Sequence, residues 1–204
     1  MSVHENTQEE HEVVFLCNES DIDTIAACSE TEDTVLICEW EPGPGDYARK
    51  INYGFSMTLS PYVFLGADDL EFTRGWEMHA ISVAEKQQVG VIGTDDDANP
   101  MVKRGKHSTH TLVTRAYIDE QGGTWHDGPG VVYCEEYDHQ FVDTELVQAA
   151  IDRDQWAFSK RSLVRHLHPF FGGLPMDDVY KKALAHGRED STLFLERQKR
   201  ARRR

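Results

Sequence analysis

The sequence predicts an α/β fold, in which a mostly parallel sheet is flanked by helices and followed by a helical C-terminal segment. Three short apolar runs support this prediction, at 13–17, 34–38 and 62–65. Each run is continuous rather than alternating and is rich in β-branched or aromatic residues, as strands covered on both faces are. Helical stretches separate the runs, so we expect βαβ connections and parallel strands.

The segments between and after these runs carry helix and turn signals. Asp21 can cap a helix through about residue 28, and after a Pro/Gly turn Tyr47, Ile51 and Phe55 recur at the spacing of one helix face. Later elements are expected at 75–85 (helix), 89–93 (strand), 111–114 (strand), 144–151 (helix), and 177–185 and 191–200 (helices). The sequence has no repeat and no low-complexity linker, so we expect one domain over 1–204.

The composition narrows the class of partner. The chain carries 36 Asp and Glu against 21 Lys and Arg, a formal net charge of −15. This charge argues against a general polyanion binder, because phosphate backbones are held by clustered cations. Residues 197–204 hold six cationic side chains and are expected to form a solvated basic tail, while 1–11 form a polar lead-in.

The cysteines and the N-terminus indicate a compartment. The four cysteines show no Cys-x-x-Cys pair, which is typical of buried thiols in a reducing environment. The first twelve residues lack the features of a secretory signal, and no run approaches the roughly 20 apolar residues of a membrane span. We therefore expect a cytoplasmic, soluble protein.

Two adjacent carboxylates, Asp68 and Asp69, follow directly on the apolar run at 62–65. Ligands of open α/β sheets bind outside the carboxyl ends of the strands, so this position faces a ligand in such a fold. Neighbouring carboxylates repel each other unless a cation or a proton compensates, and hard divalent ions prefer oxygen ligands. The two residues are therefore candidate metal ligands, with a solvated turn as the alternative.

Histidines form two further candidate groups. His166 and His168 alternate with apolar residues and would point the same way on a strand, as two imidazole ligands of a metal would. His107 and His110 lie in a polar, Gly-flanked segment, where they either hydrogen-bond a substrate or order the loop. A core or surface role is the alternative for His166 and His168.

Asp143 precedes a helical stretch and has two interpretations. Its carboxylate can cap the helix, or it can act as a general base that takes a proton from a hydroxyl nucleophile. The spacing of residues along the chain does not separate the two.

Read in order, five segments resemble a GT-A glycosyltransferase of the family 2 type. They are GDYARKIN at 45–52, YVFLGADD at 62–69 followed by Gly75 and Trp76, VIGT at 91–94, VDTEL at 142–146 and VRHLHP at 164–169. The likeness is closest to small glycosyltransferases of actinobacteria and their phages, and it spans about 45–180. It implies a GT-A, Rossmann-like fold and transfer of a sugar from a nucleotide-sugar donor to an acceptor hydroxyl, with inversion at the anomeric carbon.

The resemblance also implies a metal site. Asp68 would bind Mn²⁺ or Mg²⁺, with Asp69 beside it against the donor, and the ion would offset charge on the departing diphosphate. His166 would supply a further ligand, with His168 as the fallback.

Catalytic and donor-binding residues follow from the same resemblance. Asp143 would be the base that activates the acceptor, with Glu145 in reserve. Lys50 and Asn52 would lie near the nucleotide, where a cation and an amide engage phosphate or ribose oxygens. Apart from the resemblance, the polar, Gly-flanked segment favours contact of His107 and His110 with the substrate.

The chain departs from the family pattern at two places. Gly66 stands where the first acidic residue of the metal-binding motif is expected. Such proteins also open with a strand, a turn and a helix before the segment that begins here at Val13, and the preceding twelve residues are polar. We therefore expect a complementing N-terminal chain or a homo-oligomer to supply this unit. Unusual pairing of the arm, or loss of catalysis, are the alternatives.

Other readings stay open from the sequence. A metal-dependent hydrolase could use the same Asp and His residues, and a non-catalytic sugar-nucleotide-binding subunit would need no turnover. The acceptor could be modified DNA, a virion protein or an envelope glycan, and a phage-encoded enzyme would act in the host cytoplasm.

Overall fold

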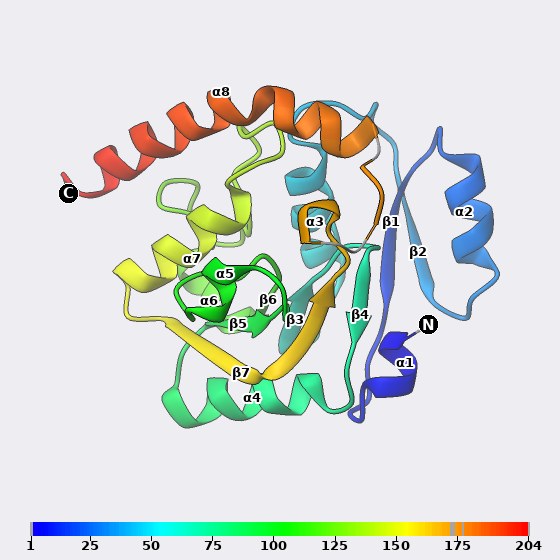
Figure 1. The fold of residues 1–204 in the computed structure, drawn as a ribbon, viewed down its shortest axis with the longest axis horizontal. Helices are drawn as coiled ribbons and strands as arrows, with labels where there is room; N and C mark the ends of the chain where they lie inside the picture. The colour runs from blue at the N-terminus through cyan, green and yellow to red at the C-terminus, as the bar shows by residue number, and fades with distance from the viewer. Residues whose placement is uncertain (1, 172–173, 177, 204) are drawn as a thin grey trace.

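The computed structural model describes residues 2–171, 174–176 and 178–203. Its strands are β1 Val14–Asn18, β2 Thr34–Cys38, β3 Tyr62–Leu65, β4 Leu70–Phe72, β5 Val91–Asp95, β6 Thr111–Thr114 and β7 Trp156–His166. Its helices are α1 Ser2–Asn6, α2 Ile22–Ser29, α3 Asp46–Met57, α4 Trp76–Gln87, α5 Pro100–Lys103, α6 Arg115–Gln121, α7 Val142–Asp152 and α8 Asp178–Ala201, with a 3₁₀ turn, η1, at Pro169–Phe171. Figure 1 shows α4 and α8 on opposite sides of the molecule.

The strands form two sheets. A central sheet has the order β3-β6-β5-β7-β4, and β1 and β2 pair with each other in a separate sheet. The predicted α/β class is confirmed, but the sheet is mixed rather than mostly parallel. Of the pairings in the described residues, β1–β2 and β5–β7 are parallel, whereas β6 runs antiparallel to β3 and β5, and β4 antiparallel to β7. A buried apolar run has the same composition in either direction, so the sequence does not reveal strand polarity.

Both faces of the central sheet are covered. Val91 and Val113 pack into one core cluster with α3, α6 and α7, whereas their neighbours Ile92 and Leu112 pack with Ala80 of α4 in another. This division follows from the two-residue period of a strand, which turns successive side chains to opposite faces. All five residues of β5 are buried, as expected for a strand between two layers.

The polar lead-in is docked on the domain. Residues 2–6 form α1, and the Gln8 backbone N–H donates to the Glu77 carboxylate at 2.6 Å. The indole N–H of Trp76 donates to the Thr7 hydroxyl at 3.0 Å. These contacts use groups at the first turn of α4, where backbone N–H groups and their dipole favour a carboxylate such as Glu77.

The C-terminal segment is one helix, α8, where two were expected, and residue 177 of the predicted helix at 177–185 lies outside the described residues. Asp190, in the middle of α8, is 3% exposed and accepts hydrogen bonds from the backbone N–H groups of Asp138, His139 and Gln140 at 2.7–3.0 Å. Asp190 lies between the two predicted helix ranges, where it fixes this loop against α8, and the helix continues through it.

Arg197 corrects the expectation of a solvated tail over 197–204. Its side chain is buried, 2% exposed, and donates to both oxygens of Glu145 at 2.8 and 2.9 Å and to Asp127 at 2.6 Å. A buried guanidinium needs carboxylate partners because desolvation of the unpaired charge costs several kcal/mol. The tail is therefore anchored at its first residue, while Arg202 and Arg203 are exposed and Arg204 lies outside the described residues.

We expect Arg197→Leu to destabilise the fold by about 3–5 kcal/mol, because the Glu145 carboxylate stays buried without its cation. Urea denaturation of the variant measures this loss. Arg200→Leu is the matched control: Arg200 lies on the same helix but is exposed, and its replacement should change the free energy of unfolding by less than about 0.5 kcal/mol. Equal effects of the two substitutions would contradict a structural role for the Arg197–Glu145 pair.

Candidate metal and catalytic site

The candidate site lies where β3, β5 and β7 end and β6 begins. Asp69 follows β3, and its backbone carbonyl accepts a hydrogen bond from the Leu167 N–H at 2.9 Å. This bond holds the β3–β4 connection against the end of β7, where His166 is the last strand residue. His110 directly precedes β6. Three segments distant in sequence thus bring polar side chains to one edge of the sheet.

Asp69, His110 and His166 form a group that could hold a metal ion. One ligand atom of each lies within 4.8 Å of the others, and the His166 Nε2 lies 3.1 Å from the Asp69 Oδ2. Metal bonds to nitrogen and oxygen are about 2.0–2.2 Å, so two ligands on one ion are separated by up to roughly 4.4 Å. Small side-chain adjustments bring all three atoms to a shared ion.

The orientation of the His110 ring is fixed by a backbone contact. Its Nδ1 lies 3.1 Å from the Leu65 carbonyl oxygen, which can only accept, so Nδ1 carries the proton. The Nε2 of the neutral ring therefore carries a lone pair, and this buried atom has no hydrogen-bond partner. Burial, with the charge of His166, lowers the pKa of His110 to about 4, which keeps the ring neutral near pH 7.

The structure places the two other predicted metal ligands differently. Asp68 is exposed and its carboxylate is outside the group that Asp69 joins. His168 lies beyond the end of β7, and its ring stacks edge-on against His166 with centroids 5.0 Å apart. The strand ends at His166, so the alternation of a strand, on which the prediction for His168 was based, does not extend to His168.

Asp143 and His107 form an ion pair at the same site. The His107 Nε2 lies 3.4 Å from the Asp143 Oδ2, and both side chains are about four-fifths buried. Burial by itself lowers the pKa of His107, but the hydrogen bond and charge of Asp143 outweigh it and raise the pKa. Burial likewise favours protonated Asp143, yet His107 and the Thr144 N–H hold the pKa of this carboxyl below its usual value. Asp143 is therefore ionised at neutral pH.

Asp143 belongs to the first turn of α7 rather than to its cap position. The helix begins at Val142, and the residue before it, Phe141, has φ 69° in the left-handed region. A bulky residue in that region is strained and persists only where its surroundings impose it, as the packing of Phe141 on Phe194 does here. This turn directs the start of α7 and Asp143 toward His107.

The charges of Asp69 and Asp143 shift the pKa values of the same two side chains, Tyr47 and His110. After burial, the charge of Asp143 and then that of Asp69 raise the pKa of Tyr47. Both carboxylates also act on the His110 ring. The candidate metal ligand and the candidate base therefore both lie near the Tyr47 and His110 rings.

Glu145, the reserve base, has a structural position instead. It is 1% exposed, and besides Arg197 it accepts hydrogen bonds from the Tyr137 hydroxyl at 2.6 Å and the Trp125 N–H at 3.1 Å. On a helix, residues two apart point to different sides, so Glu145 enters the core while Asp143 faces the site. Its oxygens are fully engaged by protein donors.

The two predicted nucleotide contacts also have protein partners. The Asn52 amide oxygen accepts from the N–H groups of Val132 and Tyr133 at 2.9 Å, and its nitrogen donates to Tyr133 and Glu135. The Lys50 ammonium lies 3.2 Å from Asp46, one helical turn earlier. Asn52 holds a loop against α3, and Lys50 keeps its nucleotide role only as a prediction.

A second acidic group, Asp127, Cys134 and Glu136, also has ligand-like spacing. Arg197 lies 2.6 Å from Asp127 and 3.5 Å from Glu136, and its guanidinium already supplies the positive charge that a metal would bring. This group is therefore an ion-pair network around the helix α8.

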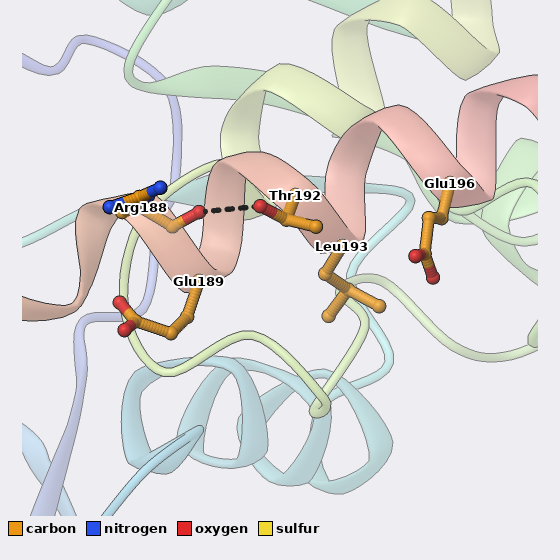
Figure 2. A pocket seen from close by; sticks show the side chains of 5 residues that line it. All are labelled: Arg188, Glu189, Thr192, Leu193 and Glu196. Atoms are coloured by element: carbon orange, nitrogen blue, oxygen red, sulfur yellow. Dashed lines mark hydrogen bonds between the residues drawn. The ribbon is translucent and has the colours of Figure 1, made fainter.

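A surface hollow runs along one side of α8 and is lined by Arg188, Glu189, Thr192, Leu193 and Glu196 (Figure 2). The Thr192 hydroxyl donates to the Arg188 carbonyl at 2.9 Å, a bond within the helix. The hollow is open and contains none of the candidate ligands or bases.

Solved structures show the same arrangement of elements. Glucosyl-3-phosphoglycerate synthase from Mycobacterium tuberculosis, in complex with Mn²⁺, uridine diphosphate and phosphoglyceric acid, matches 91% of this chain and 67% of its own, with a TM-score of 0.61 and 12% identity. A complex of that enzyme with Mn²⁺, UDP-glucose and phosphoglyceric acid matches 85% and 66%, with a TM-score of 0.55 and 12% identity. The chain has a GT-A fold.

A third structure, described as a mycobacterial protein, matches 76% of this chain and 56% of its own, with a TM-score of 0.52 and 12% identity. This chain thus spans 56% to 67% of the length of the three structures, and the likeness concerns the fold. Neither a protein-family model nor a curated protein matches the chain. Among the described residues, no helix combines the length and apolar character needed to cross a bilayer.

The ion pair of the site predicts a pH-dependent effect of His107→Gln. Asp143, with its lowered pKa, contributes stability above about pH 4, and His107, with its raised pKa, contributes below about pH 6.5, so the pair acts fully only between these values. We expect the variant to lose about 1 kcal/mol at pH 5.5 and less at pH 8.5, as measured by urea denaturation.

Lys106→Gln is the control for this prediction, because Lys106 is the exposed neighbour of His107. Its effect on the free energy of unfolding should be small and equal at both pH values. A His107→Gln loss that stays constant from pH 5.5 to 8.5 would show that the pair does not carry the effect.

Proposed function

We propose that this chain is a metal-dependent glycosyltransferase that transfers a sugar from a nucleotide-sugar donor to an acceptor hydroxyl. The observation that carries this proposal is the joint position of a metal-ligand group, Asp69 and His166, and an ionised carboxylate, Asp143, at the strand ends of a GT-A fold. Neighbouring structures of this fold hold Mn²⁺ and UDP or UDP-glucose.

The residues of the site fit a divalent cation. The Nε2 of His110 is buried without a partner, and the Asp69 carboxylate lies in contact with His166 at the same edge. Bound there, the ion would supply positive charge against the leaving diphosphate. Asp69 and His166 would hold it, and this assignment replaces Asp68, whose side chain is exposed.

Asp143 would accept the proton of the acceptor hydroxyl. A base must be unprotonated before the reaction, and the His107 partner keeps Asp143 in this state through the neutral range. His107 would also fix the direction of the carboxylate, which limits the face from which an acceptor can attack. Attack opposite the leaving diphosphate inverts the anomeric configuration, which NMR of the product reports directly.

Asp143→Asn should lower turnover by about 10²- to 10⁴-fold, the usual contribution of a general base, while donor binding persists. Turnover is measured with nucleotide sugars in the presence of Mn²⁺, and binding by donor-induced thermal stabilisation with and without the ion. Asp154→Asn is the matched control, since Asp154 is exposed after α7 and its left-handed backbone suits asparagine.

The same assay separates the rival functions. Sugar release to water without an acceptor would identify a hydrolase, and donor binding with no turnover by the wild type would identify a binding subunit. Unchanged transfer by Asp143→Asn would remove Asp143 from the reaction.

We also propose that a further strand, from a complementing chain or a second copy, joins the two sheets. In the described residues β1 pairs only with β2, and β3 only with β6, so each has an edge without a strand partner. Helix α3 covers both strands: Gly54 packs on Leu16 of β1, and Phe55 shares a core cluster with Leu65 of β3. Unpaired edges of this kind accept an added strand.

Light scattering after size-exclusion chromatography tests this proposal. We expect the active species to be larger than the 23.3 kDa chain. An active, well-folded monomer of this chain alone would contradict it.

A further inference from the structure

We propose that His110 is a third protein ligand, so that Asp69, His110 and His166 hold a transition-metal ion before any nucleotide is bound. The inference rests on the proposed function for the role of the ion, but its geometry and its test are independent of turnover. The sequence placed His110 with the substrate, whereas the structure places His110 in the ligand group. Because its Nδ1 is hydrogen-bonded to the Leu65 carbonyl, Nε2 is the nitrogen left for an ion.

The first argument is that one ring nitrogen of His110 has no hydrogen-bond partner. The residue is 6% exposed, its Nδ1 is engaged by the Leu65 carbonyl at 3.1 Å, and its Nε2 has no hydrogen-bond partner. A buried polar atom without a partner costs free energy, and a native structure retains one where a ligand completes it. The backbone carbonyl also gives the ring the orientation that metal-bound histidines have, with one nitrogen held by the protein and the other directed to the ion.

The second argument is the placement of the three groups on rigid elements. His166 ends β7, His110 directly precedes β6, and Asp69 is tied to the end of β7 through the Leu167 N–H. The His110 and His166 rings meet edge-on at 4.8 Å between centroids. The ligands are therefore in place without donor, so the ion needs no diphosphate oxygen to be retained.

The third argument concerns the identity of the ion. Gly66 removes one carboxylate from the strand end, and the remaining set is two imidazoles and one carboxylate. Imidazole nitrogen suits Mn²⁺, Co²⁺ and Zn²⁺ better than Mg²⁺, which prefers oxygen ligands and water. The site should therefore select transition ions over Mg²⁺ in the absence of nucleotide.

Isothermal titration of the metal-free protein with MnCl₂, CoCl₂ and MgCl₂ tests the proposal, with no nucleotide present. We expect Mn²⁺ and Co²⁺ to bind with one site per chain, and Mg²⁺ to bind at least tenfold more weakly. His110→Phe keeps the ring in the packing and should weaken Co²⁺ binding by more than the 10- to 100-fold typical of losing an outer-shell partner. His186→Phe, at an exposed histidine of α8 outside the ligand group, is the matched control and should leave affinity within about threefold.

A spectroscopic measurement on the wild type guards against a variant that fails to fold. Pulsed EPR of the Cu²⁺-loaded protein counts coupled imidazoles, and we expect two in the wild type and in His168→Phe. One imidazole in the wild type, loss of one in His168→Phe, or equal Co²⁺ affinity in folded His110→Phe would overturn the proposal. Metal binding only when uridine diphosphate is added would also overturn it.

The two proposals fail separately. Wild-type protein that binds Co²⁺ through two imidazoles but transfers no sugar would refute the glycosyltransferase function and support this site. Protein that transfers sugar with Mn²⁺ but shows no nucleotide-free binding would do the reverse.

Discussion

The candidate site depends on the contact between Asp69 and His166, which joins positions 97 residues apart. It exists because the β3–β4 connection is bonded to the segment after β7 through the Asp69 carbonyl and the Leu167 N–H. A carboxylate and an imidazole held at 3.1 Å attract a cation or share a proton. The neutral ring of His110 beside them, whose Nε2 has no hydrogen-bond partner, favours a cation. The metal-ligand group and its proposed chemistry both follow from this contact.

The second constraint is that two carboxylates of α7, those of Asp143 and Glu145, lie in different surroundings. Asp143 and Glu145 are two residues apart on α7, yet one faces a histidine at the site and the other a buried guanidinium in the core. The period of the helix directs the two side chains to different sides. Asp143 therefore pairs with His107, and Glu145 pairs with Arg197. The structural carboxylate and the candidate base thus come from the same turn of one helix, and α8 supplies the cation that pairs with Glu145.

Much of the fold was predictable from local pattern. The apolar runs at 34–38, 62–65 and 111–114 coincide with β2, β3 and β6, because continuous burial leaves a clear signal in composition. The long strand β7 carries Lys160, Arg161 and Arg165 among its apolar residues, and β4 is three residues long, so neither has that signal. The prediction of two helices in place of α8 was wrong. Asp190, between the two predicted ranges, binds the backbone of a distant loop, and such a contact leaves no pattern in the local sequence.

The sequence by itself determined the α/β class, the position of carboxylates after β3, and the resemblance to GT-A enzymes, because these depend on residues that are neighbours in the chain. Only the tertiary structure decided that Asp69 rather than Asp68 meets His166, that His110 joins them with a buried Nε2 that has no hydrogen-bond partner, and that Asp143 pairs with His107. These choices depend on which way a side chain turns at the end of a strand and on the segment it meets there. Neighbouring residues can therefore have entirely different contacts, and the composition of the chain does not reveal which of them meets the distant segment.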